Sequence, residues 1–135
     1  MPSSPTPPEF FVDRSLGRKL LPDALRAAGF VVHTMWSVYG AGAEQQVSDV
    51  RWVTEGAANG WVLLSKDAKM RHRSAELAAI EAAKARVFLL TNQQLTGAQQ
   101  NETYLRNIHR LVRLSEKPGP YVYGVYRDQV KHLWP

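Results

Sequence analysis

Three aspartates that lie far apart in the sequence are the residues of this chain best suited to chemistry. Asp13 ends the apolar run FFVD, Asp49 follows a serine that suits a helix start, and Asp67 lies two residues beyond the run WVLLS. Each alone has a structural explanation, because aspartate caps helices, complements helix dipoles and is favoured in turns. Brought together, the carboxylates would repel one another unless a cation neutralised them. A cluster of the three therefore predicts a Mg²⁺ or Mn²⁺ site, where a bound ion activates water for attack on a phosphodiester.

Basic residues surround the third aspartate in the segment LLSKDAKMRHR. Guanidinium groups match the geometry of phosphate with paired donors, and lysines add positive charge. The segment also fits a solvated loop, so it supports a site only together with the aspartates. The candidate RNA- or phosphate-binding residues, which include the neighbour of the first aspartate, are Arg14, Lys66, Lys69, Arg71 and Arg73.

Apolar runs and helical periodicities alternate along the chain and predict the elements that must position these side chains. Strands are predicted at residues 9–13, 30–36, 61–65 and 86–91, followed by a C-terminal hairpin that turns at 127–129. Helices are predicted over 14–29, with a kink or restart at Pro22, and over 48–58, 74–85 and 96–115. This order predicts an α/β fold, in which helices flank a mostly parallel central sheet and the crossovers are right-handed.

The predicted topology places the three aspartates on one side of the sheet. Ligands of open parallel sheets bind outside the carboxyl ends of the strands. Asp13 and Asp67 follow the ends of two such strands, and Asp49 lies in the first turn of a helix that starts on the same side. We therefore expect the three carboxylates to converge on one rim.

Length, charge and composition bound the class of protein. The 135 residues fit a single domain, which we place at residues 9–135 after a disordered proline-rich tail at 1–8. A net charge of +5 favours polyanionic partners such as nucleic acid. The chain has no cysteine, which excludes disulfides and thiol catalysis and agrees with a reducing compartment, taken here as the cytoplasm. No apolar run approaches the ~20 residues of a membrane span, and no secretory signal is visible.

Several stretches together resemble one known family. The segments FFVDRSLGRKL, VSDVRWV, GWVLLSKDAKMRHR and ARVFLLT, in this order and spacing, resemble the PIN-like domains of VapC-type toxins, the ribonuclease half of bacterial type II toxin–antitoxin pairs. The resemblance covers residues 9–91 and implies a three-layer Rossmann-like fold with an acidic pocket that holds Mg²⁺ or Mn²⁺ for RNA hydrolysis. It also implies that Asp13, Asp49 and Asp67 are the catalytic acids and metal ligands. A cognate antitoxin and, in many such proteins, a homodimer are further expectations.

The sequence departs from the resembled pattern at two positions. Lys69 stands where related sequences often carry another acid, and Arg14 stands where some have an acid beside the first aspartate. Glu44 and Glu76 are the candidate substitutes. The departures leave a second hypothesis open, in which the chain is a PIN-like module that binds RNA or a protein without cleaving anything. Exposed apolar residues around Trp36 or at 132–134 are candidates for a dimer contact.

Overall fold

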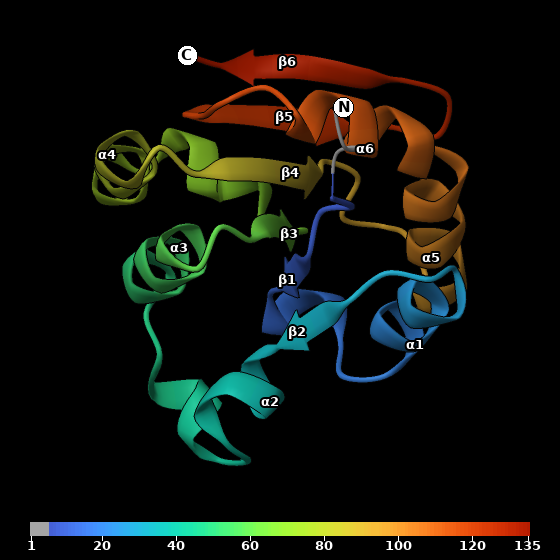
Figure 1. The fold of residues 1–135 in the computed structure, drawn as a ribbon, viewed down its shortest axis with the longest axis horizontal. Helices are drawn as coiled ribbons and strands as arrows, with labels where there is room; N and C mark the ends of the chain where they lie inside the picture. The colour runs from blue at the N-terminus through green and yellow to red at the C-terminus, as the bar shows by residue number, and fades with distance from the viewer. Residues whose placement is uncertain (1–5) are drawn as a thin grey trace, which may run out of the picture.

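Six strands form one sheet at the centre of the molecule, in the order β2-β1-β3-β4-β5-β6 (Figure 1). The computed structural model describes residues 6–135. The strands are β1 (Phe10–Val12), β2 (Val32–Thr34), β3 (Val62–Ser65), β4 (Arg86–Leu90), β5 (Tyr121–Val125) and β6 (Val130–Trp134). Strands β1 to β5 pair parallel with one another, and β6 pairs antiparallel with β5. The predicted α/β fold with a mostly parallel sheet is therefore confirmed, as is the C-terminal hairpin.

Helices cover both faces of the sheet and complete three layers. They are α1 (Leu20–Ala27), α2 (Met35–Tyr39), α3 (Asp49–Ala58), α4 (Ser74–Ala83), α5 (Gly97–Arg106) and α6 (Ile108–Ser115). In Figure 1, α3 and α4 lie on one side of the sheet, and α1 and α5 lie on the other. Three short 3₁₀ turns, η1 (Arg14–Leu16), η2 (Ala43–Gln46) and η3 (Ala68–His72), connect these elements.

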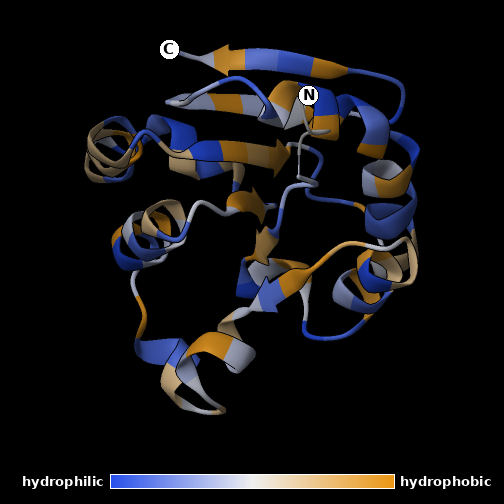
Figure 2. Ribbon diagram, in the orientation of Figure 1, coloured by the Kyte–Doolittle hydropathy of each residue, from blue (hydrophilic) through white to orange (hydrophobic). Residues whose placement is uncertain are grey.

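The central strands are apolar on both faces because each face is buried under helices (Figure 2). Side chains that alternate along a strand enter different halves of the core. Phe10 and Val12 pack in the half covered by α1, α5 and α6, whereas Phe11 packs in the half covered by α3 and α4. The short strand β1 is thus held from two sides, and its carboxyl end is fixed where Asp13 begins.

A glycine allows α3 to lie close to the strands that end at the aspartates. A Cβ atom added at Gly56 would come within 2.5 Å of Leu63 Cδ2 and within 2.8 Å of Phe11 Cδ2. Side chains larger than hydrogen would therefore push α3 away from β1 and β3. Since Asp49 is the first residue of α3, this close approach also sets the position of its carboxylate.

The strand predicted at 30–36 ends earlier than its apolar pattern suggests. β2 stops at Thr34, whose side chain accepts a hydrogen bond from the backbone of Ser37, while the Ser37 hydroxyl accepts one from the backbone of Thr34. This capping box starts a helix at Met35. Part of the predicted strand and of the predicted loop after it is therefore helical, because local capping prevails over the apolar run.

Two predicted helices are each divided. Residues 14–29 form the turn η1 and the helix α1, separated around Gly17, whose φ of 86° breaks a right-handed helix. Pro22 lies in the first turn of α1, where its missing N–H has no cost. The helix predicted at 96–115 is broken at the buried Asn107, whose amide donates to the carbonyls of Thr103 and Tyr126.

The proline-rich tail predicted at 1–8 falls mostly on residues 1–5, which lie outside the described residues. Residues 6–8 have no regular secondary structure. Within residues 6–135, none of the helices has the length and apolar character needed to cross a membrane.

Candidate active site

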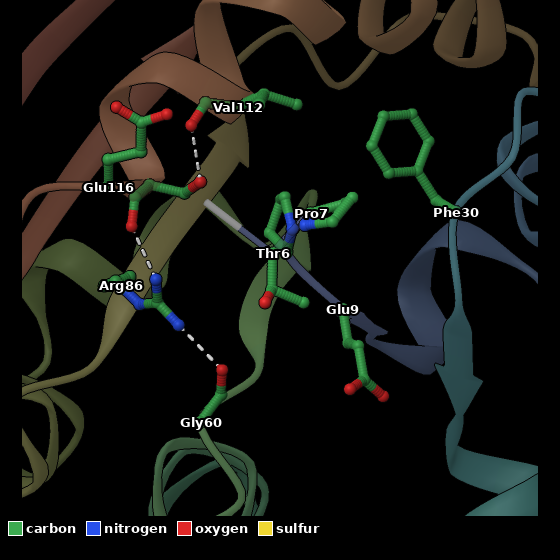
Figure 3. A pocket seen from close by; sticks show the side chains of 10 residues that line it. Thr6, Pro7, Glu9, Phe30, Gly60, Arg86, Val112 and Glu116 are labelled. Atoms are coloured by element: carbon green, nitrogen blue, oxygen red, sulfur yellow. Dashed lines mark hydrogen bonds between the residues drawn. The ribbon is translucent and has the colours of Figure 1, made fainter. Parts of the chain in front are cut away.

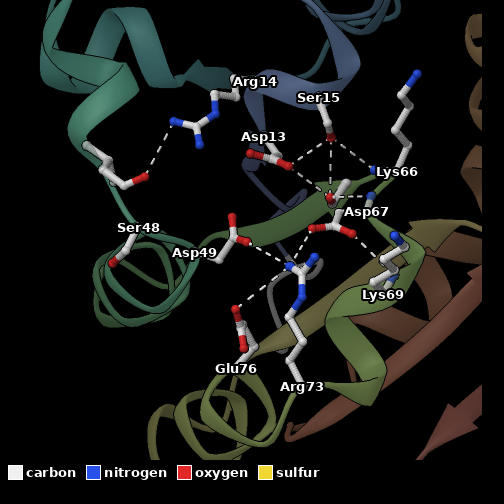
Figure 4. A network of polar contacts seen from close by, with 12 residues as sticks. Asp13, Arg14, Ser15, Ser48, Asp49, Lys66, Asp67, Lys69, Arg73 and Glu76 are labelled. Atoms are coloured by element: carbon white, nitrogen blue, oxygen red, sulfur yellow. Dashed lines mark hydrogen bonds and ion pairs between the residues drawn. The ribbon is translucent and has the colours of Figure 1, made fainter.

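The three predicted aspartates meet in one hollow at the carboxyl edge of the sheet (Figure 4). The hollow has a volume of about 290 Å³. Its lining combines carboxylates, cations and neutral polar groups: Asp13, Arg14, Ser15, Asp49, Lys66, Asp67 and Gln93. The aspartates come from the end of β1, the start of α3 and the loop after β3, so residues 54 positions apart share one small space.

Asp13 is a buried carboxylate held by two hydroxyl groups. Its side chain is not a helix cap, since it makes no capping hydrogen bond at η1. Instead Oδ2 accepts from Ser15 Oγ at 2.8 Å and from Ser65 Oγ at 3.0 Å. The residue is only 4% exposed, and no Lys or Arg forms an ion pair with it among the described residues. A buried carboxylate held by hydroxyls alone is suited to bind a cation.

Ser65 links the buried Asp13 to the loop that carries Asp67. Its hydroxyl donates to Asp13 and accepts the backbone N–H of Asp67 at 3.0 Å. The fully buried Tyr104 donates its hydroxyl to the Ser65 carbonyl at 2.8 Å and so holds the end of β3. Ser15 and Ser65 were not among the site residues predicted from the sequence. A polar residue ending an otherwise apolar strand beside an aspartate, as in FFVDRS and LLSKD, is the signal that was available.

A guanidinium lies among the acids (Figure 4). Arg73 Nη1 is 2.8 Å from Asp67 Oδ2, 3.4 Å from Asp49 Oδ2 and 3.8 Å from Glu76 Oε1. Asp67 also accepts the backbone N–H of Lys69 through Oδ1, which starts η3. The hydrogen bond to Asp67 is the largest cause of a raised pKa of Arg73, and the negative charges of Asp67, Glu76 and Asp49 raise it further. Arg73 is thus the counter-ion of the cluster.

The carboxylates of the hollow act on one another electrostatically. The pKa of Asp49 is raised, first by burial and then by the negative charges of Asp13, Asp67 and Glu76, while Arg73 opposes the shift. Glu76, one of the two candidate substitutes, therefore belongs to the cluster. Glu44, the other, does not line the hollow; it is 4% exposed, and its Oε2 has no hydrogen-bond partner among residues 6–135.

The donor set fits a hard divalent ion by its chemistry, although the side chains are not gathered around one. Carboxylate and hydroxyl oxygens are the ligands that Mg²⁺ and Mn²⁺ prefer. In the arrangement described for residues 6–135, however, no three acidic or histidine side chains are placed to hold a metal ion. Arg73 supplies the positive charge in that arrangement. An ion would therefore compete with this guanidinium for the same oxygens.

Comparison with known proteins identifies the family. Residues 8–92 match the family described as "PIN like domain". The chain belongs to the PIN-like family. A protein of Mycobacterium tuberculosis named "Putative ribonuclease VapC45" is 34% identical over 120 residues, which cover 89% of this chain and 87% of that protein. No solved structure matches the chain. The resemblance to VapC-type PIN-like domains is thus confirmed, and the matched range includes all the acids of the cluster.

The predicted basic residues of this PIN-like domain occupy different places. Arg14 and Lys66 line the hollow, and Arg14 is tied to the backbone carbonyl of Glu44 at 2.9 Å. Lys69 is exposed beside the hollow, and Arg73 lies among the acids. Arg71 is half-buried, with a buried Nε that has no hydrogen-bond partner in the described part of the chain. Two of the five therefore line the hollow itself.

A larger cavity of the PIN-like domain lies elsewhere, at the amino ends of the strands (Figure 3). It has a volume of about 790 Å³ and is lined by residues that include Pro7, Glu9 and Phe30. The guanidinium of Arg86, which also lines the cavity, donates to the carbonyls of Ser115 and Gly60 and so links two segments of the chain. The lining of this cavity gathers no acid cluster, and the three aspartates lie at the opposite edge of the sheet.

Replacing Asp49 by asparagine should stabilise the metal-free protein. Because the pKa of Asp49 is raised in the folded state, its ionised form is penalised, and the penalty is present above that pKa and fades as the pH falls through it. Arg73 keeps Asp67 and Glu76 as partners in the variant. We expect a gain of roughly 0.5–2 kcal/mol at pH 7 in EDTA, typical of relieving a strained functional group.

Thermal unfolding at pH 7 and at stepwise lower pH checks this expectation. The difference between Asp49→Asn and wild type should shrink toward acidic pH. Asp128→Asn, which removes an exposed carboxylate paired with Arg106, is the control and should not stabilise the protein. A lower midpoint for Asp49→Asn at pH 7 in EDTA would show that Asp49 is not under repulsion.

Proposed function

We propose that this PIN-like protein is a Mg²⁺- or Mn²⁺-dependent endoribonuclease and the toxin of a toxin–antitoxin pair. The observation that supports it best is the meeting of Asp13, Asp49 and Asp67, from three separate elements, in one hollow, where the Arg73 guanidinium pairs with Asp49 and Asp67. The similarity to a relative named as a ribonuclease supports RNA as the substrate. The positive net charge of +5 agrees with a polyanionic substrate.

The acids and the serines of the hollow have different proposed roles. Asp13, Asp49 and Asp67 would hold the ion, with Glu76 as a fourth acid, and the ion would activate water and neutralise charge on the scissile phosphate. Ser15 and Ser65 keep the buried carboxylate of Asp13 oriented by donating to one of its oxygens. Both hydroxyls contact Oδ2, so within residues 6–135 no hydroxyl donates to Oδ1 of Asp13.

The proposed role of the basic residues is to bind the phosphates of the RNA. Lys66 at the wall of the hollow, and Arg14 beside it, place positive charge next to the carboxylates, where a phosphate must approach. We infer that Arg73 turns away from the acids when the ion is bound and contacts the RNA backbone, as do Lys69 and Arg71. A guanidinium is suited to this exchange because it pairs equally with carboxylate and phosphate.

The proposed partner is a cognate antitoxin that covers the hollow. Arg73 shows that the acids accept a guanidinium, so an antitoxin that inserts an arginine among them, or competes for the metal with its own acid, would silence the site. Co-expression with an adjacent small gene should yield a complex that no longer cleaves RNA. Cleavage by the complex at the rate of the free chain would contradict this assignment. Cytoplasmic location and a homodimer stay predictions.

A cleavage assay tests the proposed activity. The purified chain should degrade single-stranded RNA in Mn²⁺ or Mg²⁺ and stop when EDTA is added. The second hypothesis, a PIN-like module that does not cleave, is favoured by one observation: no three acids among residues 6–135 are placed around an ion. Titration of Mn²⁺ into the purified protein separates the two, since no binding at millimolar metal would support the module.

A further inference from the structure

A second hollow opens on the same edge of the sheet as the acids. It has a volume of about 460 Å³ and is lined by Arg18, Lys19, Asp23, Arg26, Thr34, Trp36 and Ser37. We propose that this basic groove binds the single-stranded RNA on one side of the scissile phosphate. The inference rests on the proposed function and adds the path of the substrate, with Arg18, Lys19 and Trp36 as the residues that bind it.

The groove lies next to the acidic hollow, both along the chain and across the sheet. Thr34, which lines the groove, is paired in register with Val12, the residue before Asp13. Ser15 lines the acidic hollow and Arg18 lines the groove, so one short segment after β1 forms a wall of both. A strand of RNA whose phosphate lies at the acids would therefore meet the groove next.

Two cations in the groove are available to a ligand. The carboxylate of Asp23 is paired with Arg26 at 3.5 Å, and Arg26 also donates to the Val32 carbonyl at 2.9 Å. Arg18 and Lys19 are exposed, and in the part of the chain that the structure describes neither has an ion pair. Unpaired cations in a concave surface attract phosphate, whose binding releases counterions from the RNA.

An aromatic ring completes the groove. Trp36 is half-exposed at the start of α2, and the guanidinium carbon of Arg18 lies 5.8 Å from the centre of its ring. Aromatic side chains beside unpaired cations are the usual surface for single-stranded nucleic acid, because bases stack on the ring and phosphates meet the charges. The groove therefore offers a ring for a base and, beside it, cations without ion-pair partners among residues 6–135 for the phosphates.

Binding of a fluorescein-labelled single strand of twelve uridines, measured by anisotropy in EDTA so that nothing is cleaved, tests the groove. The double variant Arg18→Ala/Lys19→Ala should weaken binding about tenfold at 0.1 M salt and reduce the salt slope by roughly 1.4, since each single-strand contact contributes about 0.7. The control is Arg113→Ala/Lys117→Ala, which removes the same charge from exposed positions in and beyond α6. It should change the affinity less than twofold.

The ring is tested separately from the charges. Trp36 packs partly against the core, so Trp36→Leu, which keeps an apolar contact, is compared with Trp36→Phe, which keeps a ring. Trp36→Leu should weaken binding about tenfold without changing the salt slope, and Trp36→Phe should restore most of the affinity. Equal midpoints of thermal unfolding for the two variants make the comparison valid.

The outcomes separate this inference from the proposed function. Wild type that neither binds the RNA in EDTA nor cleaves RNA in Mn²⁺ would refute both. Cleavage by wild type, with groove variants that bind as wild type does, would refute the groove alone. Groove variants that keep RNA binding but lose an antitoxin would assign the surface to a protein and overturn the RNA assignment.

Discussion

Asp13→Asn should abolish Mn²⁺-dependent RNA cleavage while leaving the fold intact. Asparagine has nearly the same shape, and its carbonyl oxygen can still accept the hydroxyls of Ser15 and Ser65. What is lost is the negative charge that a metal ligand provides. Mutating a residue that only hydrogen-bonds to a metal ligand typically lowers activity about 10–100-fold. Loss of the ligand itself should therefore lower the cleavage rate by more than about 100-fold.

Asp67→Asn should have the same effect on cleavage, and it should also weaken the contact between Arg73 and this position. It removes the charge that Arg73 contacts at 2.8 Å, but it keeps an oxygen for the Lys69 backbone. The control is Asp128→Asn, an exposed acid far from the hollow in sequence and paired with Arg106. Cleavage rates are measured at saturating Mn²⁺, with circular dichroism to confirm folding. A rate for Asp67→Asn within twofold of wild type would remove this residue from the catalytic set.

Arg73→Gln should change metal binding and catalysis in opposite directions. Without the guanidinium, an ion no longer competes for Asp49, Asp67 and Glu76, so the dissociation constant for Mn²⁺ should fall about threefold, the scale of exposed ion pairs. Cleavage at saturating Mn²⁺ should nevertheless drop about 10–100-fold, because a charge that contacts the phosphate in the transition state is lost.

Isothermal titration with Mn²⁺ and cleavage kinetics check the two halves separately. Lys69→Gln removes an equal charge from the same loop without touching the acids, and its Mn²⁺ affinity should stay close to that of wild type. Weaker Mn²⁺ binding by Arg73→Gln would mean that the arginine organises the carboxylates for metal instead of competing with it. Unchanged cleavage would mean that Arg73 does not reach the substrate.

The sequence was sufficient to predict the sheet and the side of it on which the acids lie. Runs such as WVLLS and RVFLL are apolar at consecutive positions, which is typical of strands buried on both faces. Given parallel strands, the aspartates that follow β1 and β3 must lie at the same edge. Asp49 followed from the helix start at Ser48, whose side chain caps α3. These inferences use only local pattern and topology.

The orientation of Arg73 could not be predicted in the same way. A run of basic residues has the same sequence pattern whether its side chains point to solvent or inward, and only the path of η3 turns this one toward the acids. Glu76 is three residues after Arg73, a helical spacing that permits an ion pair, but the sequence offered Glu44 equally. The break at Asn107 was also hidden, because its hydrogen bonds to the β5–β6 turn are tertiary.

A crystal structure with Mn²⁺, recorded at a wavelength where manganese scatters anomalously, tests the central claim most directly. We expect an anomalous peak bounded by the carboxylates of Asp13, Asp49 and Asp67, with the Arg73 guanidinium withdrawn from Asp67. Crystals equilibrated with millimolar Mn²⁺ that show no peak there, and an Arg73 still paired with Asp67, would contradict it.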